Sequence, residues 1–130
     1  MSNELILIVE DNEKNRRLAR DILQVKGYRT VEAETGETGL ELAVQQAPDL
    51  VLMDIHLPGM NGIEALKKLR AAEATRRIPV LAFTASVMPQ DRREIIDAGF
   101  DGFVSKPINL KEFIATVAQA LADERPGGAA

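Results

Sequence analysis

The chain has 130 residues, the size of one ordinary domain with a single hydrophobic core. Hydrophobic residues make up 45% of it and charged residues 28%, which is typical of a globular protein and excludes disordered and collagen-like classes. The net charge is −4, and the lysines and arginines are scattered along the chain without forming one basic block. We therefore expect no direct nucleic-acid partner.

Cysteine is absent and histidine occurs once, which removes disulfides, thiolate chemistry and the common zinc frameworks. Any bound metal should be a hard ion held by oxygen atoms. No apolar run approaches the length of about 20 residues that spans a bilayer, and the N-terminus MSNEL lacks the basic and apolar regions of a signal peptide. We expect no membrane insertion and a cytoplasmic location. Residues 1–122 are expected to form the domain and residues 123–130, DERPGGAA, a disordered tail.

Short apolar runs alternate with amphipathic stretches, the order typical of strands and helices in a parallel sheet. The first strand is predicted over residues 5–9, LILIV. The first helix is predicted over residues 14–25, with Asn12 as its N-cap. Its sheet-facing side is predicted to carry three apolar residues at helical spacing, Leu18, Ile22 and Val25.

The second and third pairs of elements follow the same alternation. Residues 29–33 carry interspersed polar side chains, so we predict a strand at an edge of the sheet. Residues 36–46 are the second predicted helix, which Pro48 ends. Its predicted inward face carries Leu40, Ala43 and Val44. A continuous apolar strand over residues 50–53 and a helix over residues 62–72 flank the turn-rich loop IHLPGMN.

The last four predicted elements are strands over residues 80–83 and 102–104 and helices over residues 89–97 and 110–121. The complete pattern is (βα)5. Right-handed crossovers and short loops then favour a doubly wound, flavodoxin-like α/β fold. Its five-stranded parallel sheet should have the order 2-1-3-4-5, with helices on both faces.

Polar residues follow the predicted strands at one edge of the sheet: Glu10 and Asp11 after the first, Asp54 after the third, Thr84 after the fourth and Lys106 after the fifth. In such sheets ligands bind beyond the carboxyl ends, where the strand order reverses, here between the first and third strands. Carboxylates held together repel one another unless a cation sits between them. Mg²⁺ with retained waters suits this open acidic site and leaves room for phosphate oxygens. The set predicts phosphoryl transfer to a carboxylate.

Five separated motifs make the sequence resemble the receiver domains of two-component response regulators, over about residues 4–122. They are LIVEDN after the first strand, LVLMDIHLPGMNG around Asp54, FTAS at Thr84, GF at residues 102–103 and SKP at Lys106. LIVEDNEKN and TASVMPQD are similar to the receivers of phosphorelays, including those of hybrid kinases and stand-alone regulators. One acidic pair would be weak evidence, but the ordered set is specific.

This resemblance implies that Asp54 is the phosphoryl acceptor. It also implies that Glu10, Asp11 and Asp54 hold Mg²⁺ together with the backbone carbonyl of His56. Read without the resemblance, Glu10 and Asp11 also fit a solvated helix start, because acids interact favourably with the helix dipole there. His56, the one histidine of the sequence, could tune hydrolysis from its position two residues after Asp54, although an exposed loop histidine is the commoner case.

The remaining site residues are assigned by the same resemblance. Thr84 and Lys106 would contact the phosphoryl oxygens, and the small Ala85 would leave access to the site. Thr84 and Phe103 would form the switch pair, with Phe103 at a position where many relatives carry tyrosine; plain packing fits Phe103 equally well. Ser86 fits a role at the site or none. The bond from Lys106 to the following proline is typically cis in such domains.

The predicted function is a single-domain response regulator. It would take a phosphoryl group from a histidine kinase or histidine phosphotransfer protein onto Asp54 with Mg²⁺, and signal to a downstream protein target through phosphorylation-dependent contacts. It would catalyse its own phosphorylation and slow hydrolysis without being a conventional enzyme. One alternative is a Mg²⁺-dependent phosphohydrolase, which would need a substrate pocket and a further acid. The other is the receiver fragment of a hybrid histidine kinase, although the initial methionine and the tail favour a stand-alone chain.

Overall fold

The computed structural model describes residues 3–85 and 88–122. Ser86 and the predicted tail, residues 123–130, lie outside this part of the chain, so the expectations for them stay predictions. Among the described residues, no helix has both the length and the apolar character required to cross a membrane.

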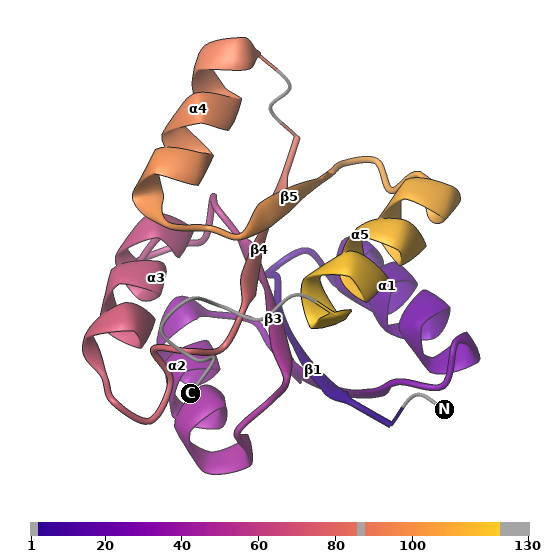
Figure 1. The fold of residues 1–130 in the computed structure, drawn as a ribbon, viewed down its shortest axis with the longest axis horizontal. Helices are drawn as coiled ribbons and strands as arrows, with labels where there is room; N and C mark the ends of the chain where they lie inside the picture. The colour runs from indigo at the N-terminus through magenta and orange to yellow at the C-terminus, as the bar shows by residue number, and fades with distance from the viewer. Residues whose placement is uncertain (1–2, 86–87, 123–130) are drawn as a thin grey trace.

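A five-stranded parallel sheet with the order β2-β1-β3-β4-β5 forms the centre of the molecule, as predicted. Its strands are β1 Leu5–Val9, β2 Arg29–Ala33, β3 Leu50–Asp54, β4 Val80–Thr84 and β5 Gly102–Ser105. The helices are α1 Glu13–Val25, α2 Gly36–Gln46, α3 Gly62–Ala71, α4 Pro89–Ala98 and α5 Leu110–Ala122. Helices α1 and α5 cover one face of the sheet, and α2, α3 and α4 cover the other (Figure 1). The doubly wound fold is therefore confirmed.

Two hydrophobic layers result from the alternation of side chains along the strands. In β1, Leu7 and Val9 contribute to the layer under α2, α3 and α4, whereas Ile6 and Ile8 contribute to the layer under α1 and α5. Strands β1, β3 and β4 are buried throughout, but in β2 only Ala33 is buried. The prediction of an edge strand at residues 29–33 is thus confirmed.

The buried faces of α1 and α2 contain small residues and differ in part from the predicted faces. In α1 the buried residues are Ala19 and Leu23, whereas Leu18 is 46% exposed and Val25 84% exposed. Ile22 packs partly against the core, so the predicted face of this helix was wrong at its two ends.

In α2 the buried stripe is Gly36, Gly39 and Ala43. Leu40 is partly buried, but Val44 is 58% exposed, so the predicted inward position of Val44 was also wrong. A Cβ atom at Gly39 would lie 2.8 Å from Cγ2 of Val9, which shows how closely this helix approaches β1. The close approach rotates the larger residue Val44 toward solvent.

The ends of the elements follow local hydrogen-bonding rules. Asn12 caps α1 as predicted, since its side chain accepts a hydrogen bond from the backbone N–H of Asn15 at 3.0 Å. Asn61 and Glu64 form a capping box at the start of α3. Helix α4 ends at Gly99, whose φ of 113° favours glycine. The Lys106–Pro107 peptide bond is cis, as expected from the resemblance.

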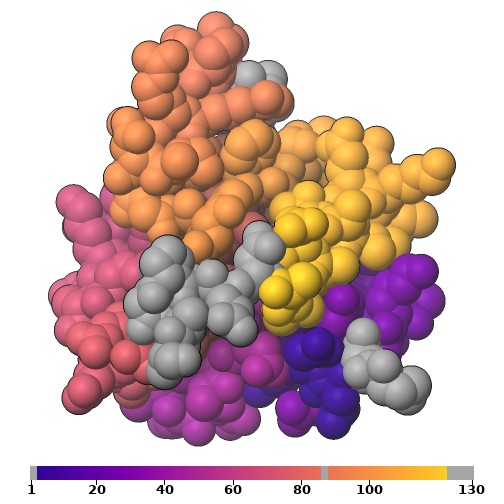
Figure 2. Space-filling view, in the orientation of Figure 1, coloured from indigo at the N-terminus to yellow at the C-terminus, as the bar shows by residue number. Residues whose placement is uncertain are grey.

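Helix α4 is the least deeply packed of the five. Ile95 is its only buried residue, and in the space-filling view α4 projects beyond the rest of the molecule (Figure 2). It starts after Met88 without a side-chain cap, with Pro89 at its first position. Few buried contacts therefore hold α4 against the sheet, which is the local condition for movement.

Candidate functional site

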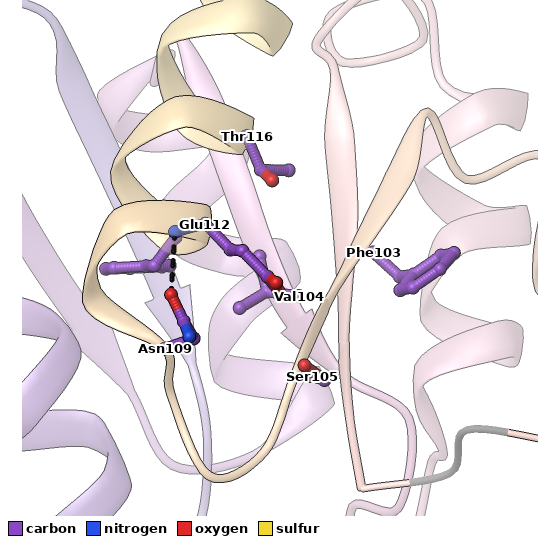
Figure 3. A pocket seen from close by; sticks show the side chains of 7 residues that line it. Phe103, Val104, Ser105, Asn109, Glu112 and Thr116 are labelled. Carbon is purple, nitrogen blue, oxygen red and sulfur yellow. Dashed lines mark hydrogen bonds between the residues drawn. The ribbon is translucent and has the colours of Figure 1, made fainter.

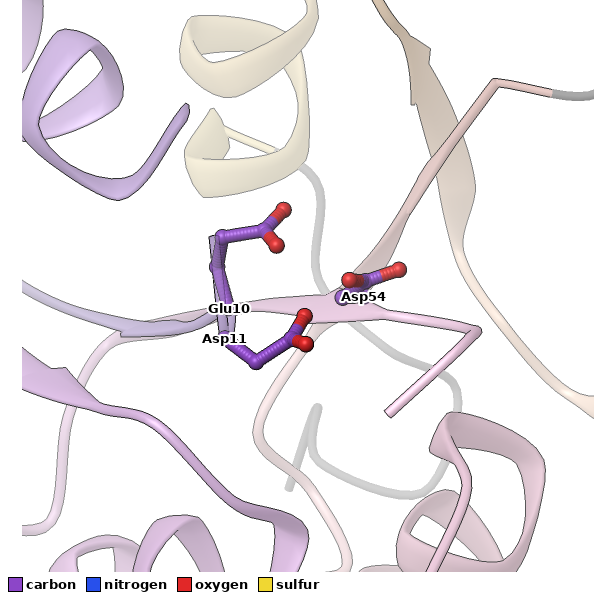
Figure 4. Close-up of side chains that lie close together, drawn as sticks. All are labelled: Glu10, Asp11 and Asp54. Carbon is purple, nitrogen blue, oxygen red and sulfur yellow. The ribbon is translucent and has the colours of Figure 1, made fainter. Parts of the chain in front are cut away.

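Three carboxylates converge beyond the ends of β1 and β3 (Figure 4). Glu10 and Asp11 directly follow β1, and Asp54 is the last residue of β3. Because Val9 pairs with Met53 in the parallel register, the two strands end side by side. One carboxylate oxygen of each acid lies within 4.8 Å of the others. Glu10 and Asp54 are buried and Asp11 is exposed, so the cluster opens toward solvent at Asp11.

Lys106 supplies the positive charge of this cluster. Its Nζ lies 2.7 Å from Oε1 of Glu10 and 3.2 Å from Oδ2 of Asp54. The backbone N–H of Lys106 donates to the carbonyl of Thr84 at 2.9 Å, which fixes the residue beyond β5. Strand β4 separates β5 from β3, so the long lysine side chain must reach across β4 to meet the acids.

Phe83 of β4 lies next to the side chain of Lys106. Nζ of Lys106 is 4.8 Å from the centroid of the Phe83 ring, a distance at which the ring face attracts the ammonium. Phe83 is not among the site residues predicted from the sequence. The available signal was its position, directly before Thr84 and paired in the sheet with Asp54 on one side and Val104 on the other.

Burial has the largest effect on the pKa values of Glu10 and Lys106 in this cluster. It raises the pKa of Glu10 from 4.5 to about 7, against the opposing effects of the hydrogen bonds from Lys106 and from the backbone N–H of Asn12. For Lys106, burial alone would lower the pKa, but the hydrogen bond to Glu10 and the charge of Asp54 outweigh it, so the net shift is upward. Lys106 is therefore a firmly held cation, and Glu10 is poised to gain or lose a proton near neutrality.

The carboxylate of Asp54 is held on both sides. The backbone N–H of His56 donates to Oδ1 at 3.0 Å, while Oδ2 faces Lys106. The imidazole of His56 is exposed and lines a groove with Thr84, Asp91 and Ile95. The predicted contribution of the His56 carbonyl to the metal site stays a prediction.

The donor atoms fit a hard divalent cation. All three side chains offer carboxylate oxygens, which are the ligands that Mg²⁺ prefers, and the exposed Asp11 leaves an open side for waters or phosphate oxygens. Oε1 of Glu10 is buried, and its partner among the described residues is the ammonium of Lys106 at 2.7 Å. The acidic pocket is thus typical of a Mg²⁺ site.

The predicted switch residues lie on the side of the sheet that carries α4. Thr84 is buried at the end of β4, beside Ser105 of β5. Phe103 is partly buried, and the guanidinium of Arg92 in α4 lies 5.0 Å from the centroid of its ring. Residues of β5 and α5 line a small pocket, and the Phe103 ring points away from Glu112 of α5 (Figure 3). Phe103 therefore links β5 to α4 and not to α5. Ala85 is exposed next to Thr84, which agrees with the expected access.

The fold and the acidic site define a class of signalling protein, and comparison with known proteins gives the same result. The family model of the response regulator receiver domain matches residues 6–118. The chain belongs to this family.

Individual proteins of the family show how similar the sequences are. The chain is 43% identical over 118 residues to the polar-differentiation response regulator DivK of Brucella ovis, and the match covers 91% of this chain and 96% of that relative.

Solved structures of receiver domains and response regulators also have the fold of this chain. The receiver domain of a sensor histidine kinase from Pseudomonas aeruginosa, with a magnesium ion coordinated in its active site cleft, is 31% identical with a TM-score of 0.85 and covers 93% of this chain and 99% of that one. The chemotaxis response regulator CheY4 of Vibrio cholerae is 26% identical with a TM-score of 0.85, covering 91% and 98% of the two chains.

Proposed function

We propose that this chain is a response regulator that accepts a phosphoryl group on Asp54 from the phosphohistidine of a histidine kinase or histidine phosphotransfer protein. The observation that carries the proposal is the position of Asp54, which lies within ion-pair distance of Lys106 and beside both other acids. Residues 1–122 would form the receiver domain, which acts on its own as a stand-alone regulator.

In the reaction an oxygen of Asp54 attacks phosphorus, the P–N bond to the donor histidine breaks, and the histidine retains the electron pair and takes a proton. The product is an acyl phosphate, which water later cleaves to restore the carboxylate and release inorganic phosphate. Asp54 is prepared for attack because the N–H of His56 and the ammonium of Lys106 fix the orientation of its carboxylate.

Charge accumulates on the phosphoryl oxygens during the transfer. Lys106 is positioned to stabilise it, and the buried hydroxyl of Thr84 lies at the neighbouring strand end. Glu10, Asp11 and Asp54, with the carbonyl of His56, would hold Mg²⁺. The bound ion supplies electrostatic stabilisation of the phosphoryl oxygens.

The signal would then leave through α4. Phosphorylation draws Thr84 toward the new phosphoryl group, Phe103 follows, and the sparsely packed α4 shifts with it, because Phe103 contacts α4 through Arg92. A downstream protein target would read this changed surface. Phosphotransfer profiling against purified histidine kinases from the same cell would identify the donor, and no preference among them would contradict a dedicated kinase.

The direct test is chemical labelling. The small donor acetyl phosphate with Mg²⁺ should add one phosphoryl group to the wild type, seen by intact-mass spectrometry, and none to Asp54→Asn. Labelling that persists in the variant would place the acceptor elsewhere. Continuous turnover of small phosphate esters would instead favour the phosphohydrolase alternative, and neighbouring coding sequence for a kinase core would favour the hybrid-kinase fragment.

A further inference from the structure

Arg16 of α1 contacts the end of β1 but has no role in the phosphoryl transfer described above. Its Nη1 donates to the backbone carbonyl of Glu10 at 3.0 Å, and its Nε donates to Oε1 of Glu32 in β2 at 3.1 Å. Its Nη2 lies 3.9 Å from a carboxylate oxygen of Glu34. The side chain is only 11% exposed, although it belongs to a surface helix. One planar guanidinium thus ties the end of β1 to the edge strand.

We propose that Arg16 is a positioning residue, which holds the Glu10–Asp11 turn in the geometry that binds the divalent cation. This inference rests on the function proposed above. The ladder between β1 and β3 ends at Val9 and Met53, so the carbonyl of Glu10 lies beyond the last pair of the sheet. Arg16 gives that carbonyl a fixed hydrogen-bond donor at the point where the chain must turn its two acids toward Asp54.

The opposite side of the same turn is also held, but by different groups. The N–H of Glu10 donates to the carbonyl of Ala33, and the N–H of Asn12 donates to Oε2 of Glu10. Together with these hydrogen bonds, Arg16 therefore fixes the backbone of Glu10, whose buried carboxylate would bind the ion. Its fork-shaped geometry explains the residue type, because a lysine cannot donate to the carbonyl of Glu10 and to Glu32 at once in fixed directions.

The direction in which loss of Arg16 changes the affinity for Mg²⁺ distinguishes a positioning role from a purely electrostatic one. Removing a positive charge near an acidic site should strengthen binding of a cation if charge alone matters. Loss of a positioning contact should weaken it, because the acids must then be ordered when the ion binds. The neighbouring Arg20 provides a matched control, since it also pairs with Glu32, at 3.7 Å, but makes no contact with Glu10 among the described interactions.

The test measures Mg²⁺ binding to the folded proteins by titration calorimetry, well below their melting temperatures. We expect Arg16→Met to raise the Kd about fivefold, Arg16→Lys to raise it to a similar degree, and Arg20→Met to change it less than twofold. In chelator, the Asn12 amide should exchange with solvent faster in Arg16→Met than in the wild type. Acetyl phosphate labelling of Arg16→Met should approach the wild-type rate at saturating Mg²⁺.

An unchanged or lowered Kd in Arg16→Met would overturn the inference, and so would an equal rise in Arg20→Met, which would mean that ion pairing between α1 and β2 matters as a whole. If Arg16→Met does not fold, Arg16→Lys decides the question by the same titration: a raised Kd supports the inference and an unchanged Kd overturns it. Absence of Mg²⁺ binding or labelling in the wild type would instead refute the proposed function itself.

Discussion

Replacing Asp54 with Asn should stabilise the metal-free protein. The substitution keeps the shape of the side chain and leaves an oxygen to accept the hydrogen bond from His56, but removes one charge from the buried cluster. Glu10 and Asp11 then lose a repulsive neighbour, and Lys106 loses one of its two ion pairs. The net result depends on which of these effects is larger.

The distances give the balance. At an effective dielectric constant of about 20, two like charges no more than 4.8 Å apart repel by at least roughly 3 kcal/mol, so Asp54 is opposed by both other acids. Its attraction to Lys106 at 3.2 Å is about 5 kcal/mol on the same scale. Asp11 is exposed and Glu10 is partly protonated near neutrality, which weakens the repulsion. We therefore expect a net stabilisation on the order of 1 kcal/mol, the usual scale for relieving one unfavourable interaction.

Thermal melts in chelator and in millimolar Mg²⁺ measure this. A change of 1 kcal/mol moves the midpoint of a domain of this size by roughly 3–6 °C. Mg²⁺ at ten times its Kd should stabilise the wild type by about 1.4 kcal/mol, and the variant by less because it lacks a ligand. If Mg²⁺ leaves the wild-type midpoint unmoved, the carboxylates form no metal site. If Asp54→Asn melts lower than the wild type in chelator, the ion pair with Lys106 outweighs the repulsion among the acids and the predicted stabilisation is wrong.

Two further predictions concern the same edge of the sheet. Because burial raises the pKa of Glu10 from 4.5 to about 7, the fold holds this proton more tightly than the unfolded chain does, so its stabilising contribution is complete below about pH 4.5 and is lost as the pH rises to about 7. Thermal melts in chelator should show this loss of stability in the wild type but not in Glu10→Gln. The Kd of the wild type for Mg²⁺ should fall over the same pH range, because the proton on Glu10 ceases to compete with the ion. If the melting temperatures of both proteins change with pH in parallel, Glu10 does not have the raised pKa. In Gly62→Ala the new methyl group would overlap the carbonyl oxygen of Asp54 and lie 2.8 Å from Cα of Ile55, so denaturant unfolding should show a loss of about 1–3 kcal/mol and acetyl phosphate labelling should slow; wild-type values for both would mean that α3 adjusts freely.

The sequence predicted the sheet and the cluster for one reason. In a parallel sheet all strands end at the same edge, so residues after separate strands, such as Asp11, Asp54 and Lys106, can be placed together without knowing any side-chain conformation. Helix faces were harder to predict. A hydrophobic pattern gives weight to large residues such as Leu18 and Val44, whereas contact with the sheet is made where small residues allow the closest approach.

Contacts that depend on reach and direction also lay beyond the sequence. Phe83 reads as one more apolar residue of a strand, and its place under Lys106 follows only from the path of the lysine across β4. Arg16 reads as one of two adjacent arginines on an exposed helix. Its neighbour Arg17 is 61% exposed and pairs with Glu13 within the helix, as surface arginines commonly do. Arg16 is turned inward toward Glu10 by the rotation of α1 about its axis, which buries Ala19 and Leu23.

The charge of the cluster explains why one lysine is not enough. With all groups ionised, three carboxylates and one ammonium leave a net charge of about −2, which a single divalent cation neutralises. A phosphoryl group on Asp54, as proposed above, would carry a charge of about −1.5 to −2 in place of −1 and would therefore require more positive charge nearby. Lys106 already forms an ion pair with Asp54 at 3.2 Å, and its ammonium also lies 2.7 Å from Glu10. Any movement of its ammonium toward the phosphoryl oxygens would weaken this ion pair and leave Glu10 more dependent on the metal ion. On the proposed function, Lys106 and the divalent cation would together balance the added charge, and Glu10 at the end of β1 would be the group whose charge balance changes on phosphorylation.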